Sequence, residues 1–209
     1  MSPSAEISKR IFELLSEDGF WQPSRGIYVK PWIDAWRGWI SIDSGRYNLG
    51  PVVGLFNDEL LKASSKALKR LGAPWRYGKN GPPLIMINLQ QLAEQDSESR
   101  TRISWTYSGE PLQVSVADDI VCCIRTCGYP YIQRHTSIEA VLRAAVDERR
   151  ASPAFIMYLP ILLIKLGQLD TLRQVVAIQR ERPVSADLSV SYEQYVDALL
   201  ELRDGSQSE

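Results

Sequence analysis

The residues with the most evident potential for chemistry are aromatic and basic side chains near the N-terminus. Four of the six tryptophans lie between residues 21 and 39, with arginine and lysine interleaved among them. Tryptophan and arginine combine a large contact area with a polar tip, and they contribute much of the binding energy at protein interfaces. The pattern indicates a recognition surface, although the same rings could instead form the core of a sheet.

Strand periodicity divides these side chains between two faces. Over residues 35–56 apolar and polar positions alternate, which predicts two antiparallel strands joined by a turn at Ser44, Gly45 and Arg46. One face then carries Trp36, Ile40 and Ile42 toward the core. We predict a partner-binding surface formed by Trp32, Arg37, Trp39, Ser41, Asp43 and Arg46. For the Trp39 ring, a surface position and a core position both stay open.

Catalytic groups are sparse. The single histidine, His135, precedes a predicted helix, and no nucleophile stands near it in a recognisable pattern. The chain has no Gly-x-Ser-x-Gly motif, no Walker loop and no Rossmann glycine pattern. The adjacent acids Asp118 and Asp119 cannot share a helix face, so they are interpreted as first-turn charges of a helix. The sequence therefore predicts no catalytic residue.

Three cysteines, Cys122, Cys123 and Cys127, fall within one short stretch. Cys123 and Cys127 are four residues apart on a predicted helix and share a face, where two thiolates could hold a metal if two more ligands came from elsewhere. Structural zinc sites usually show two close pairs of ligands, so packing within the helix is the favoured interpretation. We predict no metal and no cofactor. Such closely spaced cysteines are poor material for structural disulfides, which indicates a reducing cytoplasm.

The composition, with 44% hydrophobic and 23% charged residues, is that of an ordinary globular protein. The formal net charge of -1 makes nucleic acid an unlikely partner class, because phosphate binding needs a basic surplus. The N-terminal stretch mixes charges into its apolar pattern and does not resemble a signal peptide. The apolar run over residues 154–166 is too short to span a bilayer and is interpreted as a buried helix, so no membrane association is predicted.

The order of predicted elements is a helix, strands, a helix, further strands and then a series of helices. This order predicts an α+β fold with an antiparallel sheet of about four to six strands packed against helices and an all-helical C-terminal part. We expect one domain over residues 1–209, with a sheet-containing part over 1–135, a helical part over 136–204 and a disordered tail over 205–209. Capping boxes are predicted at Thr136 to Glu139 and at Ser191 to Gln194.

Three short motifs resemble a pattern found in small uncharacterised bacterial proteins. They are Gly38-Trp39-Ile40, the run Pro51-Val52-Val53-Gly54-Leu55, and Gly128-Tyr129-Pro130 followed by Ser137-Ile138-Glu139. Some such proteins resemble immunity proteins encoded beside polymorphic or contact-dependent toxins. The resemblance covers residues 19–142 and implies a cytosolic protein that binds one cognate toxin domain and blocks it. It implies no catalytic residue.

The first hypothesis is therefore a cytosolic binding protein, most concretely an immunity protein. The alternative is an enzyme or small-ligand-binding protein with a pocket between the sheet and the C-terminal helices, near His135 or Tyr129. A third hypothesis is a structural partner in a larger assembly, docked through the helical hairpin around Gly167.

Overall fold

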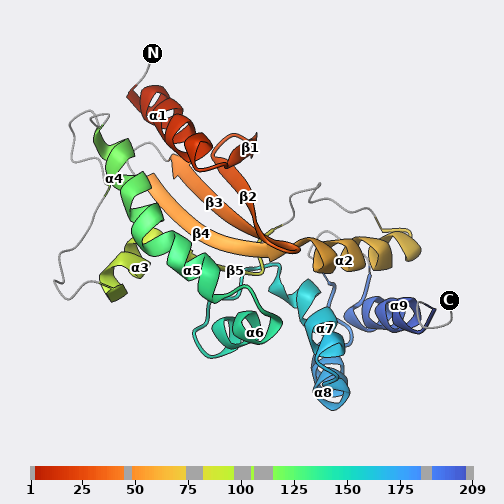
Figure 1. Cartoon of the computed structure of the whole chain (residues 1–209). Coiled ribbons are helices and arrows are strands. Elements are labelled where there is room, and N and C mark those ends of the chain that lie inside the picture. Colours follow the sequence, from red (N-terminus) through yellow and green to blue (C-terminus); the bar gives the residue numbers. More distant parts are fainter. Residues whose placement is uncertain are drawn as a thin grey trace. The chain divides into compact units, whose positions relative to one another are not determined.

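The computed structural model describes residues 3–44, 49–73, 82–96, 105, 115–184 and 190–205. The chain divides into two compact units, each assembled from two separate stretches of sequence (Figure 1). The first unit contains Met1–Leu55 and Met86–Thr136, and the second contains Phe56–Ile85 and Ser137–Glu209. The prediction of a single domain is not tested by this division and stays a prediction.

The first unit is built on a sheet. A helix, α1 (Pro3–Glu17), precedes the strands β1 (Trp21–Ser24), β2 (Ile27–Ile33), β3 (Trp36–Ser44) and β4 (Leu49–Asn57), and β5 (Ile85–Asn88) follows later in the chain. The five strands lie in the order β1-β2-β3-β4-β5 and form an antiparallel sheet. The predicted α+β class is confirmed. The residues of the predicted turn, 45 and 46, lie outside the described part of the chain.

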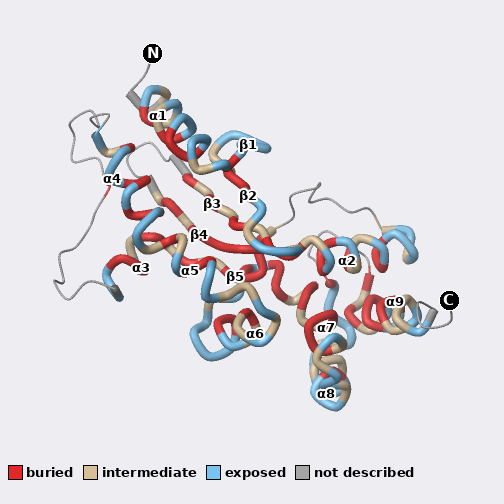
Figure 2. Tube along the Cα trace, viewed as in Figure 1, coloured by how far each residue is buried: buried red, intermediate tan, exposed pale blue. Residues whose placement is uncertain are grey.

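The periodicity of the central hairpin fixed its buried face correctly. Ile40 is fully buried, and Trp36 and Ile42 are each 7% exposed. Helix α1 presents Ile7 and Ile11 to the same core, and Figure 2 shows buried positions along the inner side of this helix and along the strands. Alternation with period two therefore predicted which half of the β3 side chains enters the core.

The helical spacing of Val116, Ile120 and Ile124 predicts a helix that ends at Gly128, and this prediction is wrong at the C-terminal end of the helix. Helix α4 (Ser115–Cys123) passes directly into a π-helical turn, η1 (Ile124–Gly128), and then into α5 (Tyr129–Arg134). Gly128 has helical dihedral angles, with φ of -67°. A Cβ at Gly128 would lie 3.2 Å from a methyl group of Val53, so this glycine serves a close approach of helix to strand and not a chain reversal.

The apolar run that begins at Leu84 predicts a buried strand over residues 84–93, and the observed strand is shorter. Strand β5 ends at Asn88, and the following residues form a helix, α3 (Leu89–Asp96), where the sequence predicted a longer strand and an irregular segment. The Asn88 side chain accepts a hydrogen bond from the backbone N–H of Gln90 at 2.8 Å, which caps this helix. The strand predicted around Trp105 lies outside the described residues, apart from Trp105 itself.

The second unit is helical. It contains α2 (Asp58–Arg70), α6 (Ile138–Val146), α7 (Phe155–Lys165), α8 (Leu169–Gln179) and α9 (Tyr192–Gly205), and α2 packs against both α7 and α9. The apolar run predicted to be a buried helix is α7, seven of whose residues are buried. Gly167 joins α7 to α8 with φ of +69° and so forms the predicted helical hairpin. No helix in the described ranges is both long and apolar enough to cross a membrane.

The capping predictions are confirmed at one position and wrong at the other. The Ser191 hydroxyl accepts from the Gln194 N–H, and the Gln194 side chain accepts from the Ser191 N–H, which is the predicted box. At α6 the cap is Ser137, whose hydroxyl accepts from the Ala140 N–H at 3.1 Å. The Thr136 hydroxyl instead donates to the Gln133 carbonyl of the preceding helix, so the helix begins one residue later than predicted.

Candidate functional site

The strand register assigns the predicted binding residues to two opposite faces of the sheet. Directly paired residues of antiparallel strands point to the same side. Val29 pairs with Trp39, and Trp21 of β1 pairs with Val29, so a row crosses three strands with an indole at each end. Val29 itself is fully buried, whereas Trp21 is 38% exposed and Trp39 is partly exposed.

The face that carries this row also carries Arg37 and Ser41, because Pro31 pairs with Arg37 and Ile27 pairs with Ser41. The Arg37 guanidinium reaches across β2 and lies 5.5 Å from the centre of the Trp21 ring, which is a cation–π contact. We refer to Trp21, Arg37, Trp39 and Ser41 as the Trp21–Ser41 face. Arg37, Trp39 and Ser41 belong to the predicted site. Trp21 was not predicted, and its pairing with Val29 places it on the same face.

Trp32 does not lie on that face. The register between β2 and β3 shifts between Pro31 and Ile33, and Trp32 is the extra residue. Its ring lies 3.2 Å from the position that a Cβ at Gly38 would occupy, and it meets the Tyr129 ring edge-on at 5.3 Å. The structure therefore places Trp32 on the side of the sheet that α5 covers, apart from Arg37 and Trp39.

The remaining two predicted residues fall where the structure gives no side chain. Asp43 lies in β3, but its side chain is outside the described residues, and Arg46 lies in the stretch between β3 and β4 that is not described. Both stay predictions.

On the α5 side of the sheet, Trp32 belongs to a compact group around one ammonium ion. The Lys30 Nζ atom lies 5.3 Å from the Trp32 ring, 5.7 Å from the Phe20 ring and 5.9 Å from the Tyr129 ring. We call Phe20, Lys30, Trp32 and Tyr129 the Lys30 cluster. Aromatic faces attract a cation through their negative quadrupole. The cluster therefore stabilises the charge of a half-buried lysine, to which the charge of the nearby Asp18 carboxylate also contributes.

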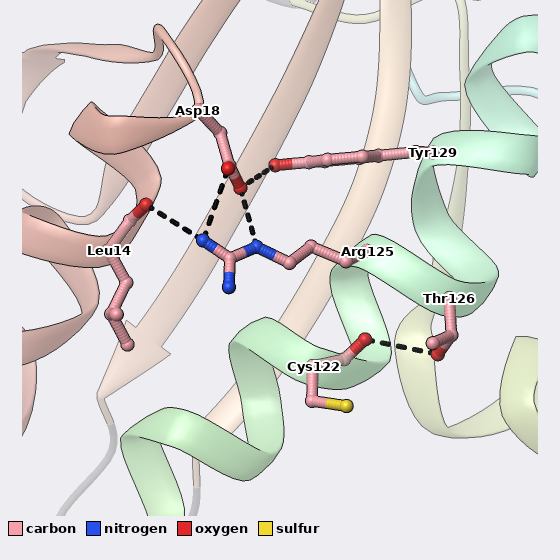
Figure 3. A network of polar contacts seen from close by, with 6 residues as sticks. All are labelled: Leu14, Asp18, Cys122, Arg125, Thr126 and Tyr129. Carbon is pink, nitrogen blue, oxygen red and sulfur yellow. Dashed lines mark hydrogen bonds and ion pairs between the residues drawn. The ribbon is translucent and has the colours of Figure 1, made fainter.

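A network of charged hydrogen bonds lies next to the Lys30 cluster and joins α1 to the π-helical turn (Figure 3). The Asp18 carboxylate accepts from Arg125 at 2.8 and 3.1 Å and also accepts from the Tyr129 hydroxyl. The second Arg125 nitrogen reaches the Leu14 carbonyl at 3.4 Å. The π-helical turn thus presents Arg125 to the C-terminal end of α1.

This network shifts two pKa values in opposite directions. Burial alone raises the pKa of Asp18, but the hydrogen bonds from Arg125 and Tyr129 and the charges of Arg125 and Lys30 lower it by more, so the pKa lies below that of an ordinary carboxyl group. Burial raises the pKa of the Tyr129 phenol, and its hydrogen bond to Asp18 raises it further. Tyr129 is therefore a firmly protonated donor, which suits a structural brace better than proton transfer.

The sequence alone did not identify this network. Asp18 and Arg125 are 107 residues apart, and each was interpreted only as part of a helix. No spacing pattern connects residues at such a separation. The one available signal was the position of Tyr129 next to Gly128 and Pro130, which marked the segment without indicating a partner.

The single histidine has a local structural role. His135 follows the last residue of α5, and its Nδ1 atom lies 2.7 Å from the Tyr131 carbonyl oxygen. Its ring packs on the Tyr131 ring at 4.4 Å. Within the described residues, no three metal-binding side chains come close enough together to hold an ion.

Two grooves are present in the second unit, one on each side of α8. A groove of about 470 Å³ lies among α6, α7 and α8, and one of about 430 Å³ lies between α8 and α9. Both are lined by leucine and valine together with charged residues. Neither involves the sheet, so neither bears on the predicted pocket between sheet and helices, which stays a prediction.

Comparison with known proteins identifies no relative: no family model matches the chain, and no curated protein or solved structure is significantly similar to it.

Proposed function

We propose that this chain is a non-enzymatic binding protein that recognises another protein through the Trp21–Ser41 face. The observation that carries the proposal is the pair formed by Trp21 and Arg37. A large indole held more than one third exposed, with a guanidinium stacked on it at 5.5 Å, is costly to leave in water and is well suited to burial under a partner.

The organisation of this face supports the proposal. The strands hold Trp21 and Trp39 in one cross-strand row, so little conformational entropy is lost when a partner covers them. Ser41 adds a hydroxyl that can pair with a partner's backbone at the edge of the aromatic area. The catalytic alternative has less support, because Tyr129 and His135 are both engaged in local structural contacts.

In its specific form, the proposal is that the protein is a bacterial immunity protein that acts in the cytoplasm and blocks a cognate toxin. The resemblance of its short motifs to such proteins motivates this form. The presence of Cys122, Cys123 and Cys127 as free thiols is compatible with a reducing compartment. Inhibition would occur by steric occlusion, which requires no catalytic group on this chain.

Co-expression with the product of the adjacent gene tests the specific form. We expect a stable complex on size-exclusion chromatography and restored growth of cells that produce the neighbouring protein. Growth inhibition that this chain fails to relieve, with no complex recovered, would contradict the toxin assignment.

The face itself is tested by substitution. We expect Trp21→Ala and Arg37→Ala each to weaken binding of the partner by about 10-fold or more, as for residues at the centre of an interface. Phe12→Ala is the matched control, because Phe12 is 40% exposed on α1 and does not belong to the Trp21–Ser41 face. Isothermal titration calorimetry measures the affinity, and thermal unfolding checks that each variant is folded. Equal losses for Phe12→Ala and Trp21→Ala would exclude this face as the binding surface.

A further inference from the structure

The helical second unit has an apolar groove whose lining is only partly buried. It lies among α6, α7 and α8 and has a volume of about 470 Å³, and we call it the α6–α8 groove. Its aliphatic lining residues are Leu142, Val146, Leu159, Leu163, Leu166 and Val175. Of these residues, Leu163 is buried, whereas the others stay in contact with solvent and Val146 is 62% exposed. Aliphatic side chains that gather in one hollow and face water indicate a surface that another molecule covers.

The lining residues follow the spacing of helix faces. Leu159 and Leu163 are four residues apart on α7, and Leu142 and Val146 are four residues apart on α6. Leu166, at the end of α7, continues its row by three more residues. Residues at this spacing lie along one side of a helix, so the groove extends over about two turns, or roughly 11 Å. Such a groove matches the apolar face of an amphipathic helix, whose anchors recur at the same spacing.

The charged residues that line the α6–α8 groove all belong to α6 and its C-terminal cap. They are Glu139, Arg143 and Asp147, and two carboxylates with one guanidinium sum to a formal charge of -1. All three side chains are exposed, and none of them forms an ion pair with another described residue. Their charges are therefore available to a partner, and the acidic surplus favours a partner with basic side chains.

The groove between α8 and α9 provides a contrast within the same unit. It has a volume of about 430 Å³, and its lining includes three arginines and two acids, which sum to a formal charge of +1. Each of these arginines is ion-paired with a nearby acid, at 2.7–2.8 Å: Arg173 with Asp170, Arg180 with Glu193 and Arg203 with Asp204. A basic partner would meet a basic surplus there. Charge therefore directs such a partner to the α6–α8 groove.

We propose that the α6–α8 groove is the docking site for an amphipathic helix of a partner protein, with aliphatic anchors at three- and four-residue spacing and lysine or arginine beside them. The anchors cover Val146, Val175 and the leucines of the groove, and the basic side chains lie near Glu139 and Asp147. Apolar burial supplies most of the affinity, and the charges set the orientation and the rate of association. This site belongs to the second unit and goes beyond the function proposed for the Trp21–Ser41 face.

The test uses the full chain and a fluorescein-labelled peptide of about 14 residues, or four helical turns, made of leucine and lysine with leucine along one face. Fluorescence anisotropy measures its affinity. We expect saturable binding of one peptide per chain, and this binding should weaken as the salt concentration rises. A peptide of the same pattern with glutamate in place of lysine should bind at least about 10-fold more weakly. Equal affinity of the two peptides, or no saturable binding of the lysine peptide, would overturn the proposal.

Substitutions locate the binding site of the lysine peptide. Val146→Arg places a charge in the aliphatic lining and should weaken binding by about 10-fold or more. Ile33→Arg is the matched control, because Ile33 is also an exposed β-branched residue, at 52%, and lies in β2 of the other unit. It adds the same charge and should leave the affinity unchanged. Val146→Ser removes apolar area without adding a charge and should also weaken binding, and circular dichroism checks that each variant is folded.

The double variant Glu139→Gln/Asp147→Asn tests the role of charge, and we expect it to bind the lysine peptide more weakly and with less dependence on salt than the wild type does. Equal losses for Val146→Arg and Ile33→Arg would place the peptide elsewhere and overturn the proposal. An unchanged salt dependence in the double variant would exclude a basic partner. Dimerisation of the wild type in sedimentation velocity that Val146→Arg abolishes would show that a second copy of this chain occupies the groove instead.

Discussion

Asp18 is a single carboxylate that connects residues 107 and 111 positions away in the sequence, Arg125 and Tyr129. Its side chain is 21% exposed, which keeps the ion pair partly shielded from solvent. An ion pair of this kind contributes more than a fully exposed one, because less of its Coulomb attraction is screened by water. The carboxylate therefore acts as a brace between α1 and the π-helical turn.

We expect Asp18→Asn to lower the free energy of unfolding by about 1 kcal/mol at pH 7, since it removes charge-assisted hydrogen bonds that solvent partly screens. The folded-state pKa of Asp18 is lowered, so its contribution is complete above the unfolded-state value of about 4 and is lost as the pH falls through the folded-state pKa. The difference in free energy of unfolding between the wild type and Asp18→Asn should thus become smaller below about pH 4. Urea unfolding across this range measures it.

A matched control for Asp18→Asn is the ion pair between Arg10 of α1 and Asp118 of α4, a carboxylate that is 49% exposed, whereas that of Asp18 is 21% exposed. Asp118→Asn should change the unfolding free energy less than Asp18→Asn does. Two outcomes would contradict an electrostatic role for Asp18. One is an equal loss of unfolding free energy for the two substitutions, and the other is a loss for Asp18→Asn that stays the same at low pH.

The tryptophans of β2 and β3 show how far the sequence could predict which side chains are buried and which face they share. The sequence placed Trp36 in the core correctly, and it left Trp39 open between surface and core, which matches the partial exposure observed. It grouped Trp32 with Arg37, yet Arg37 pairs with Pro31, so the next side chain of β2, Trp32, points to the opposite face of the sheet. The pairing of β2 with β3 decides which of their residues share a face, and the sequence pattern of one strand does not give that pairing.

At the scale of elements, the helices of the second unit meet around buried tyrosines. The Tyr195 hydroxyl on α9 hydrogen-bonds to the Ser64 hydroxyl of α2 at 2.7 Å and to the Met157 carbonyl of α7 at 2.8 Å. Tyr195 is completely buried, as is Ser64. One phenol therefore satisfies polar groups on two other helices, which specifies how the three pack.

We expect Tyr195→Phe to destabilise the protein by about 1–2 kcal/mol, because it leaves the buried Ser64 hydroxyl without its partner. Tyr192→Phe is the matched comparison, since the buried Tyr192 hydroxyl has no hydrogen-bond partner among the described residues. Removal of the Tyr192 hydroxyl should lower the free energy of unfolding by less than about 0.5 kcal/mol, or should raise it. Chemical denaturation of both variants measures the difference, and a larger loss for Tyr192→Phe would contradict this account.

Element boundaries were predicted well where a local cap defines them and poorly where packing does. Asparagine before the acids Asp58 and Glu59 predicts a helix N-cap at Asn57, and its side chain accepts from the N–H groups of Glu59 and Leu60. Gly128 resembles a helix stop in sequence, but it lies in continuous helix against Val53. A glycine used for close approach and a glycine used for chain reversal are identical in sequence, and only the neighbouring strand distinguishes them.

At the scale of the whole molecule, each compact unit is built from two stretches of the chain. The second unit combines residues 56–85 with residues 137–209, so α2 is as much a part of it as the C-terminal helices. Leu60 and Leu68 of α2 are buried, and Lys165 of α7 is ion-paired with Glu59 at 2.9 Å. The C-terminal helices therefore lack part of their core without α2.

We expect a fragment of residues 137–209 to show little helix by circular dichroism and no cooperative thermal transition. In this fragment the apolar surface of α7 and α9 that α2 covers in the whole protein would be exposed to water. Linking residues 56–85 to this fragment should restore a cooperative transition. Cooperative unfolding of the fragment alone would show that α2 is dispensable for this unit.

The sequence alone determined the α+β class, the faces of the central hairpin, the buried helix α7 and the Asn57 and Ser191 caps. These features depend on periodicity and on contacts within a few residues, which a pattern records directly. Only the tertiary structure decided that Trp21 meets Arg37, that Trp32 meets Tyr129, and that Asp18 meets Arg125. Those contacts join residues far apart in the chain through strand register and helix packing, and no local signal specifies either.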